Sequence, residues 1–186
     1  MNWIRNHLRT LLISFILLLG VTGVFGSFRA SRAEELTPRL QPLTSFTEND
    51  VAVEISLIKD PNGSTWLTGT FTPLLEHFHL YSKDLPKTGI NGQGRPTLME
   101  ILNPSKVRPL GELIADQPIN SHFNYALASA LPVYPEGPVT LRLPVELPQN
   151  GKDNTRLELS VTYMACSQQT CLAPVIDKVL SLVIRQ

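Results

Sequence analysis

Apolar and polar residues alternate in short runs along most of the chain after residue 50. Such alternation is typical of half-buried β-strands, because successive side chains of a strand point to opposite faces. A turn is predicted at Asp60-Pro-Asn-Gly-Ser64, which would join the first two runs into a hairpin, and the glycine-rich segment 87–96 predicts a loop. The pattern predicts strands over 51–57, 65–72, 78–82, 97–102, 107–114, 141–147, 157–163 and 175–184.

Proline placement supports the same fold class. All 15 prolines lie after residue 33, between or beside the predicted strands. Because a proline inside a helix removes a backbone hydrogen bond and clashes with the preceding turn, this spacing disfavours long helices. Pro144 falls inside a predicted strand, where proline is tolerated best at a sheet edge or a bulge. Seven to nine short strands with turns between them predict an all-β fold, an antiparallel immunoglobulin-like β-sandwich.

The first 33 residues have the composition of a signal peptide. Basic residues precede an apolar run over 11–25, and Ser31-Arg32-Ala33 is a small-x-small cleavage site before Glu34. We therefore expect residues 1–33 to be a signal peptide, 34–49 a flexible lead-in and 50–186 the folded domain. The apolar run is short for a membrane span, which needs about 20 residues. Membrane contact is accordingly expected only if the leader stays uncleaved.

Charge and compartment narrow the classes of function. Removal of residues 1–33 leaves 12 Lys+Arg against 16 Asp+Glu, a net charge of −4. A mildly acidic chain without a basic cluster is a poor binder of nucleic acid, so no nucleic-acid partner is expected. The remaining 153 residues are enough for one domain with its own core. Exported compartments permit disulfides.

The chain has two cysteines, Cys166 and Cys171, with four residues between them. Sulfurs so close in the sequence are expected to pair with each other. A disulfide here closes a small ring that contributes roughly 2 kcal/mol of chain entropy, against nearly 5 for a loop of about 100 residues. The pair also lies between two predicted strands, in a loop open to solvent. Spacing alone leaves a structural staple and a redox-active pair as two open interpretations.

Other chemistry has less support in the sequence. A structural metal site needs three or four ligands, and the mature chain offers His77, His79 and His122 besides the two sulfurs. A catalytic cysteine nucleophile needs a free thiol, which the neighbouring cysteine would capture in an oxidising compartment. We therefore expect no metal and no cofactor.

The segment Tyr163-x2-Cys166-x4-Cys171-x2-Pro174, at the end of a predicted β-sandwich, resembles the N-terminal periplasmic domain of the DsbD family of transmembrane thiol–disulfide reductases. The resemblance covers roughly residues 51–184, including the strand segment 78–82 and the Leu-Arg-Leu-Pro-Val run at 141–145. It implies an immunoglobulin-like domain whose two cysteines cycle between dithiol and disulfide. It also implies that Cys171 forms the mixed disulfide with partners.

The resemblance further implies residues around the cysteine pair. An aromatic residue on a loop caps the pair in the family, and Phe123 occupies the matching region. His79 and Tyr81 match positions that line the family's active site, and a nearby imidazolium at His79 would favour a thiolate. Tyr163 and Pro174 frame the motif. For the aromatic residues, packing in the sandwich core is the alternative interpretation.

By this resemblance the chain is an exported, periplasmic bacterial component of a thiol–disulfide oxidoreductase system. It would relay electrons between thioredoxin-fold partners, such as disulfide isomerases or cytochrome c maturation factors. Four residues separate the cysteines, whereas the best-known members have five. The sequence lacks the membrane domain and the C-terminal thioredoxin domain of full-length DsbD, so we expect a stand-alone version served by a separate transmembrane thiol reductase. The alternative is a non-catalytic β-sandwich binding or assembly module with a structural local disulfide.

Overall fold

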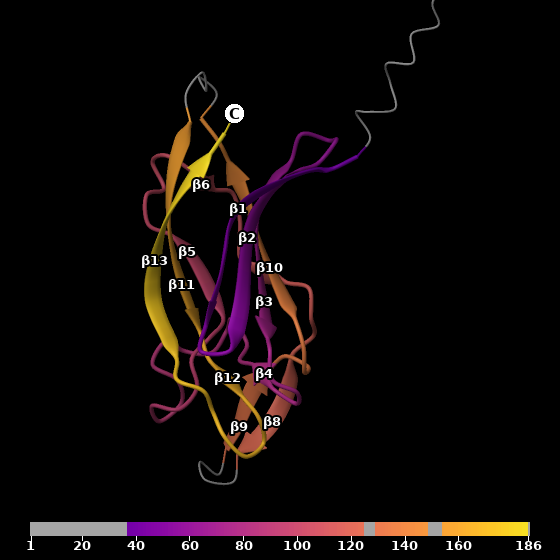
Figure 1. Ribbon diagram of the computed structural model, residues 1–186, viewed down its shortest axis with the longest axis vertical. Coiled ribbons are helices and arrows are strands. Elements are labelled where there is room, and N and C mark those ends of the chain that lie inside the picture. Colours follow the sequence, from indigo (N-terminus) through magenta and orange to yellow (C-terminus); the bar gives the residue numbers. More distant parts are fainter. Residues whose placement is uncertain (1–36, 125–128, 149–153, 186) are drawn as a thin grey trace, which may run out of the picture. The chain divides into compact units, whose positions relative to one another are not determined.

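Thirteen antiparallel-paired strands account for the regular structure of the computed structural model, which describes residues 37–124, 129–148 and 154–185 (Figure 1). No helix occurs in these ranges, so none is present there that is long and apolar enough to cross a membrane. The strands are β1 (Arg39–Glu48), β2 (Val51–Lys59), β3 (Thr65–Pro73), β4 (His79–Leu80), β5 (Leu98–Ile101), β6 (Arg108–Pro109), β7 (Ile114–Ala115), β8 (Asn120–Asn124), β9 (Ser129–Val133), β10 (Val139–Glu146), β11 (Thr155–Tyr163), β12 (Ala165–Cys166) and β13 (Val175–Ile184).

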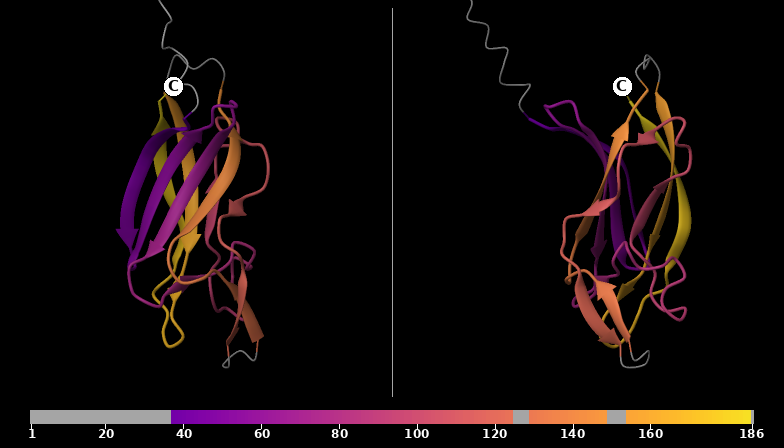
Figure 2. Two further views of the ribbon diagram at one scale, coloured as in Figure 1. Left: turned by 90° about the vertical axis from the view of Figure 1, so that its right-hand side faces the viewer. Right: turned by 180° about the vertical axis from the view of Figure 1, so that it is seen from behind.

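Two sheets face each other to make the sandwich. The first has the order β1-β2-β3-β10-β6, with β7 also paired to β10, and the second has the order β13-β11-β5. Figure 2 shows the first sheet, purple to orange, in front of the yellow strands of the second. Two further pairs, β12 with β4 and β8 with β9, extend beyond one end of the sandwich (Figure 1). The predicted all-β immunoglobulin-like sandwich is confirmed.

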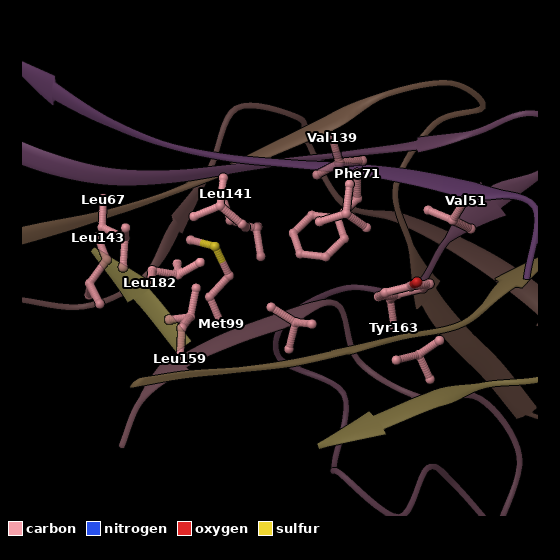
Figure 3. Close-up of a cluster of buried hydrophobic side chains, with 14 of the residues drawn as sticks. Val51, Leu67, Phe71, Met99, Val139, Leu141, Leu143, Leu159, Tyr163 and Leu182 are labelled. Atoms are coloured by element: carbon pink, nitrogen blue, oxygen red, sulfur yellow. The ribbon is translucent and has the colours of Figure 1, made fainter. Parts of the chain in front are cut away.

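The core lies between the sheets and follows from the alternation in the sequence. The inward positions of β2 alternate with exposed or partly exposed ones, and β10 and β11 contribute in the same way. Figure 3 shows side chains from both sheets meeting around Met99. Gly69 leaves room for this residue, because a Cβ at position 69 would overlap the Met99 sulfur. The buried apolar residues of the described ranges run from Val51 to Ile184.

The expected lead-in 34–49 is wrong over most of its length, because residues 39–48 form β1, the edge strand beside β2. Leu43 and Phe46 pack against the core from this strand. The hairpin turn consists of Asn49 and Asp50, whose φ angles of 50° and 52° are those of a two-residue type I′ turn. Residues 34–36 lie outside the described residues.

Three other expectations change in detail. The predicted strand 107–114 is two short pieces, β6 and β7, and the predicted strand 78–82 is regular only over β4. Pro144 lies inside the sheet rather than at its edge, since β10 is flanked by β3 and β6. The Pro144 carbonyl accepts a hydrogen bond from the Leu110 N–H at 2.8 Å. Because N and O of one residue face the same neighbour in an antiparallel strand, the missing N–H of Pro144 costs no bond to β3.

Candidate redox site around the Cys166–Cys171 disulfide

Cys166 and Cys171 are joined by a disulfide, with their Cα atoms 4.0 Å apart. Cys166 ends β12, and Cys171 lies opposite it as an antiparallel partner. The Ser167 N–H donates to the Thr170 carbonyl at 2.8 Å, and the Leu172 N–H donates to the Ala165 carbonyl at 2.9 Å. These two bonds flank the cysteine pair, so the backbone holds the two sulfurs side by side.

The four-residue loop between the cysteines is braced from inside. The Ser167 hydroxyl accepts hydrogen bonds from the N–H groups of Gln169 and Thr170, each at 3.2 Å. Beyond Cys171, the Asn49 amide of the β1–β2 turn donates to the Ala173 carbonyl at 2.8 Å. The disulfide therefore lies in an ordered turn that is tied to the sandwich on both sides.

The two sulfurs differ in environment. Cys166 is 1% exposed and packs in a second apolar cluster, separate from the main core, with Tyr81, Leu85, Leu131 and Val133. Cys171 is exposed. Cys171 is therefore the cysteine of the pair that is accessible from solvent, whereas Cys166 is shielded.

Tyr81 contacts the buried sulfur directly. Its hydroxyl donates a hydrogen bond to Cys166 Sγ at 3.3 Å, and the residue is 4% exposed. The Tyr81 carbonyl accepts from both the N–H and the hydroxyl of Thr97, at 3.2 and 2.8 Å, which fixes the residue. Burial raises the pKa of the Tyr81 phenol above its ordinary value, so the hydroxyl keeps its proton and remains a donor.

His79 also lies next to the cysteine pair. It is the register partner of Cys166 in the β4–β12 pair and is 7% exposed. Its ring meets the Tyr81 ring edge to face, with centroids 6.0 Å apart. His79 and Tyr81 thus lie together beside Cys166. Their roles in chemistry remain predictions.

A groove beside Cys171 is formed with the glycine-rich loop 87–96. Arg95 holds this loop, because its Nη1 donates to the carbonyls of Thr88 at 3.1 Å and Gly92 at 2.9 Å. The groove has a volume of about 360 Å³ and is lined by Tyr81, Gly92, Gln93, Gly94, Arg95, Met164, Cys171 and Pro174. Pro174, which the sequence motif singled out, therefore lines the approach to the exposed sulfur.

Tyr163 lies in the main core rather than against the sulfurs. Its ring packs edge to face on Phe71, with centroids 5.6 Å apart (Figure 3). Its hydroxyl donates to the Glu48 carbonyl of β1 at 3.2 Å. Burial, with a smaller contribution from the charge of Glu48, raises the pKa of Tyr163 far above its ordinary value. Tyr163 therefore occupies the position that the alternative interpretation, packing in the sandwich core, predicts.

Phe123 lies on β8, where its register partner is Ala130 of β9. The same hairpin supplies Leu131 and Val133 to the cluster around Cys166. The hairpin that carries Phe123 is thus adjacent to the buried sulfur, while the Phe123 side chain lies outside the described residues. The cap role of Phe123 remains a prediction.

Sequence reasoning missed several residues that shape the site, chiefly Leu85, Leu131, Val133 and Met164. The run Leu131-Pro-Val133 alternates apolar positions, a strand signal that points to β9. No sequence pattern pointed to Arg95, because it binds backbone carbonyls of its own loop and such carbonyls are independent of residue type. In the described ranges, no group of three or more His, Cys, Asp or Glu residues is arranged to hold a metal ion.

Fold and site together define an all-β sandwich domain with a local disulfide at one end, one sulfur buried and the other exposed. No protein-family model and no curated protein sequence matches this chain. Among solved structures, the chain is similar to the crystal structure of the Neisseria meningitidis DsbD N-terminal domain in the reduced form. The identity is 13%, the TM-score is 0.41, and the match covers 84% of this chain and 96% of that chain. It is the same domain that the cysteine motif resembles.

Proposed function

We propose that this protein is an exported thiol–disulfide exchange domain that relays electrons between thioredoxin-fold proteins through Cys166 and Cys171. The observation that carries the proposal is the asymmetry of the disulfide. One sulfur is open to a partner, and the other is buried beside a hydrogen-bond donor. In this proposal residues 1–33 direct the chain to the periplasm, and a separate transmembrane thiol reductase supplies the electrons.

The exchange begins at the exposed sulfur. A thiolate of the reduced partner attacks Cys171 Sγ, a new S–S bond forms between the two proteins, and the Cys166–Cys171 bond breaks. The bonding electron pair leaves with Cys166 Sγ as a thiolate. The Tyr81 hydroxyl, 3.3 Å away, stabilises that thiolate through a hydrogen bond.

A second thiolate of the partner then attacks the partner's own sulfur in the mixed disulfide. The partner leaves as a disulfide, and Cys171 is released as a thiolate. Two electrons have passed to the cysteine pair, and two protons from solvent complete the dithiol. The same steps in reverse reduce the next partner.

The competing function is a binding or assembly module whose disulfide is a permanent clamp. This function is supported by the backbone hydrogen bonds of Ser167 and Leu172, because they form the turn by themselves and the disulfide would only stabilise it further. The two functions differ in reduction potential, because structural disulfides of exported proteins have values below about −300 mV. Equilibration with thiol redox buffers should give a potential above that limit, with the protein folded in both states. A value well below it contradicts the relay.

Two matched variants test the direction of attack. In Cys166→Ala the exposed thiol of Cys171 remains. A thioredoxin-fold protein that keeps one active-site cysteine, supplied as its mixed disulfide with thionitrobenzoate, should be trapped on Cys171, because the Cys171 thiolate attacks the partner sulfur and thionitrobenzoate leaves. In Cys171→Ala the remaining thiol is buried, and trapping should fall by at least about tenfold. Both variants should keep the far-ultraviolet spectrum of the parent. Equal trapping by the two variants, or unfolding of both, rejects the proposed chemistry.

A further inference from the structure

A row of apolar side chains crosses the outer face of the first sheet. Leu40 pairs in register with Ile58, Ile58 with Trp66, and Trp66 with Pro144. Leu110, whose N–H donates to the Pro144 carbonyl, continues the row by one step. Directly paired residues of antiparallel strands project to the same face, so these five side chains form one line across the sheet. We call this line the apolar row.

The apolar row is exposed at both ends. Leu40 is 63% exposed and Leu110 is 55% exposed, whereas Ile58, Trp66 and Pro144 are partly buried. The Trp66 indole N–H donates a hydrogen bond to Asp60 Oδ2 at 3.0 Å, and this bond fixes the ring. The ring lines a shallow hollow together with Leu110 and Pro144.

The apolar row is confined to one end of this face. The next in-register row across the same face consists of Pro42, Ser56, Thr68, Arg142 and Ile114, and the row after that includes Glu54, Thr70 and Thr140. The face therefore becomes polar toward the disulfide. A large apolar line at one end of an otherwise polar sheet marks an interaction surface.

Charged residues of both signs border the apolar row. Its carboxylates already have partners, since Asp60 accepts from the Trp66 indole and Glu146 accepts from Arg108. Arg39 and Lys59 precede and follow its members Leu40 and Ile58, and they are register partners of each other. Like charges directly opposite in a sheet repel, and in the described ranges neither has a carboxylate within ion-pair distance. An anionic partner would relieve this repulsion.

The apolar row and the disulfide lie at opposite ends of the sandwich. The row begins at the start of β1, whereas the β1–β2 turn at the other end of that strand is bonded to Ala173, next to the cysteine loop. Figure 1 shows β12 and the β8–β9 hairpin at the lower end and the C-terminal end of β13 at the upper end. The chain enters β1 at the end of the row, and the basic and apolar sequence of residues 5–25 precedes it.

We propose that the apolar row is a membrane-docking surface, which rests the end of the sandwich distal to the disulfide on a bilayer with anionic headgroups. Leu40, Trp66 and Leu110 would enter the interface, where tryptophan is favoured, and Arg39 and Lys59 would meet lipid phosphates. Cys171 would then face away from the bilayer. This contact does not require an uncleaved leader, and it holds whether or not the disulfide is a relay.

Trp66 gives a direct probe, because Trp3 is the other tryptophan of the chain and lies in the leader. The chain from Glu34, which is the product expected after cleavage of the leader, is mixed with vesicles. One set contains phosphatidylglycerol and phosphatidylethanolamine, and the other contains phosphatidylcholine alone. With the anionic vesicles, Trp66 emission should move to shorter wavelength, and brominated acyl chains should quench it. In the full chain carrying Trp3→Phe, the same quenching should be seen.

Variants separate the row from other exposed apolar residues. The double variant Leu40→Ser with Leu110→Ser should weaken partitioning into anionic vesicles at least about tenfold. Two large apolar side chains that would be buried in the membrane interface are then missing. Arg39→Gln with Lys59→Gln should remove the preference for anionic vesicles. Val179→Ser, at a position 56% exposed on the second sheet, is the matched control and should change nothing.

Several results overturn the proposal. An unshifted and unquenched Trp66 in the presence of anionic vesicles excludes the contact. An equal loss of partitioning in Val179→Ser shows that no particular surface is used. Self-association without lipid that Leu40→Ser with Leu110→Ser abolishes, together with no vesicle binding, assigns the row to a second copy of the chain instead.

Discussion

The hydroxyl of Tyr81 donates a hydrogen bond to the sulfur of Cys166 across 85 residues of sequence, at 3.3 Å. The acceptor is the buried sulfur of the pair, which in the proposed exchange leaves as a thiolate when Cys171 is attacked. The hydrogen bond is therefore stronger in the reduced state to the extent that Cys166 is a thiolate, since a thiolate is a better acceptor than a disulfide sulfur. The hydrogen bond of Tyr81 should therefore affect the reduction potential of the cysteine pair.

Tyr81→Phe keeps the ring and removes this donor. We expect a loss of about 1 kcal/mol from the reduced state, which makes the reduction potential more negative by about 20 mV. Burial raises the Tyr81 pKa above its ordinary value, so Tyr81 stays a donor at mildly alkaline pH. The difference between variant and parent should therefore grow in this range, as more of the Cys166 thiol becomes thiolate. Redox titration against thiol buffers measures it.

Tyr134→Phe is the control, since Tyr134 is equally buried and its hydroxyl accepts from the Lys83 N–H at 3.0 Å. This variant should lose stability without a change in potential. The hydrogen bond to Cys166 has no redox role if the two variants shift the potential equally.

Tyr163→Phe removes a core hydrogen bond to the Glu48 carbonyl and should lower the free energy of unfolding by about 1 kcal/mol at neutral pH. The folded-state pKa of Tyr163 is raised above its unfolded value of about 10. The folded protein therefore holds this proton more tightly, and its stabilisation is lost as pH rises above ~10. Urea unfolding at a series of alkaline pH values should show a shallower loss in the variant. A parallel loss in both proteins would exclude Tyr163 as the source.

Gly69→Ala should destabilise the sandwich by about 1–3 kcal/mol, because the new Cβ would overlap the Met99 sulfur and approach Ile55 Cδ1 at 3.0 Å. Met99 is 3% exposed and has little room to move. A second substitution, Met99→Val, should recover part of the loss in a double-mutant cycle of chemical unfolding. Additive effects would show that the two positions do not meet.

Phe123→Ala tests the predicted cap. If Phe123 shields the cysteine pair, the reduced variant should react several-fold faster with a small oxidant, because access to the sulfur is then less hindered. The rate is followed by the loss of free thiols in stopped flow. Ala130→Ser, at the register partner of Phe123, serves as a control for changes in the hairpin. An unchanged rate removes Phe123 from the cap role.

The alternation of the sequence predicted the strands that have one face in the core. The segments 51–57, 65–72, 157–163 and 175–184 all lie within β2, β3, β11 and β13. β1 was missed because a bulge shifts its register between Pro42 and Thr44. As a result its inward residues, Leu43 and Phe46, are three positions apart instead of two or four. A bulge of this kind removes the periodic signal while it keeps the strand.

The candidate site was predictable where its residues are neighbours in the sequence. Cys166 and Cys171 pair as expected. His79 of β4 and the adjoining Tyr81 lie beside the pair although they are distant from it in the sequence, and only the family resemblance singled them out. The hydrogen bond of Tyr81 and the packing of Leu131 depend on strands far apart in the chain, which no local pattern encodes. Tyr163 shows the opposite case: it is three residues from Cys166, yet its side chain points into the main core.

Because the loop 167–170 is fastened by hydrogen bonds of its own, opening the disulfide does not require the turn to come apart. The two thiols would stay within reach of each other, which corresponds to a high effective molarity for closing the ring again. In a mixed disulfide on Cys171, the nearby thiolate of Cys166 could thus always attack Cys171 and release the partner. Encounters with partners would be brief, and the covalent complex would be short-lived unless Cys166 is removed.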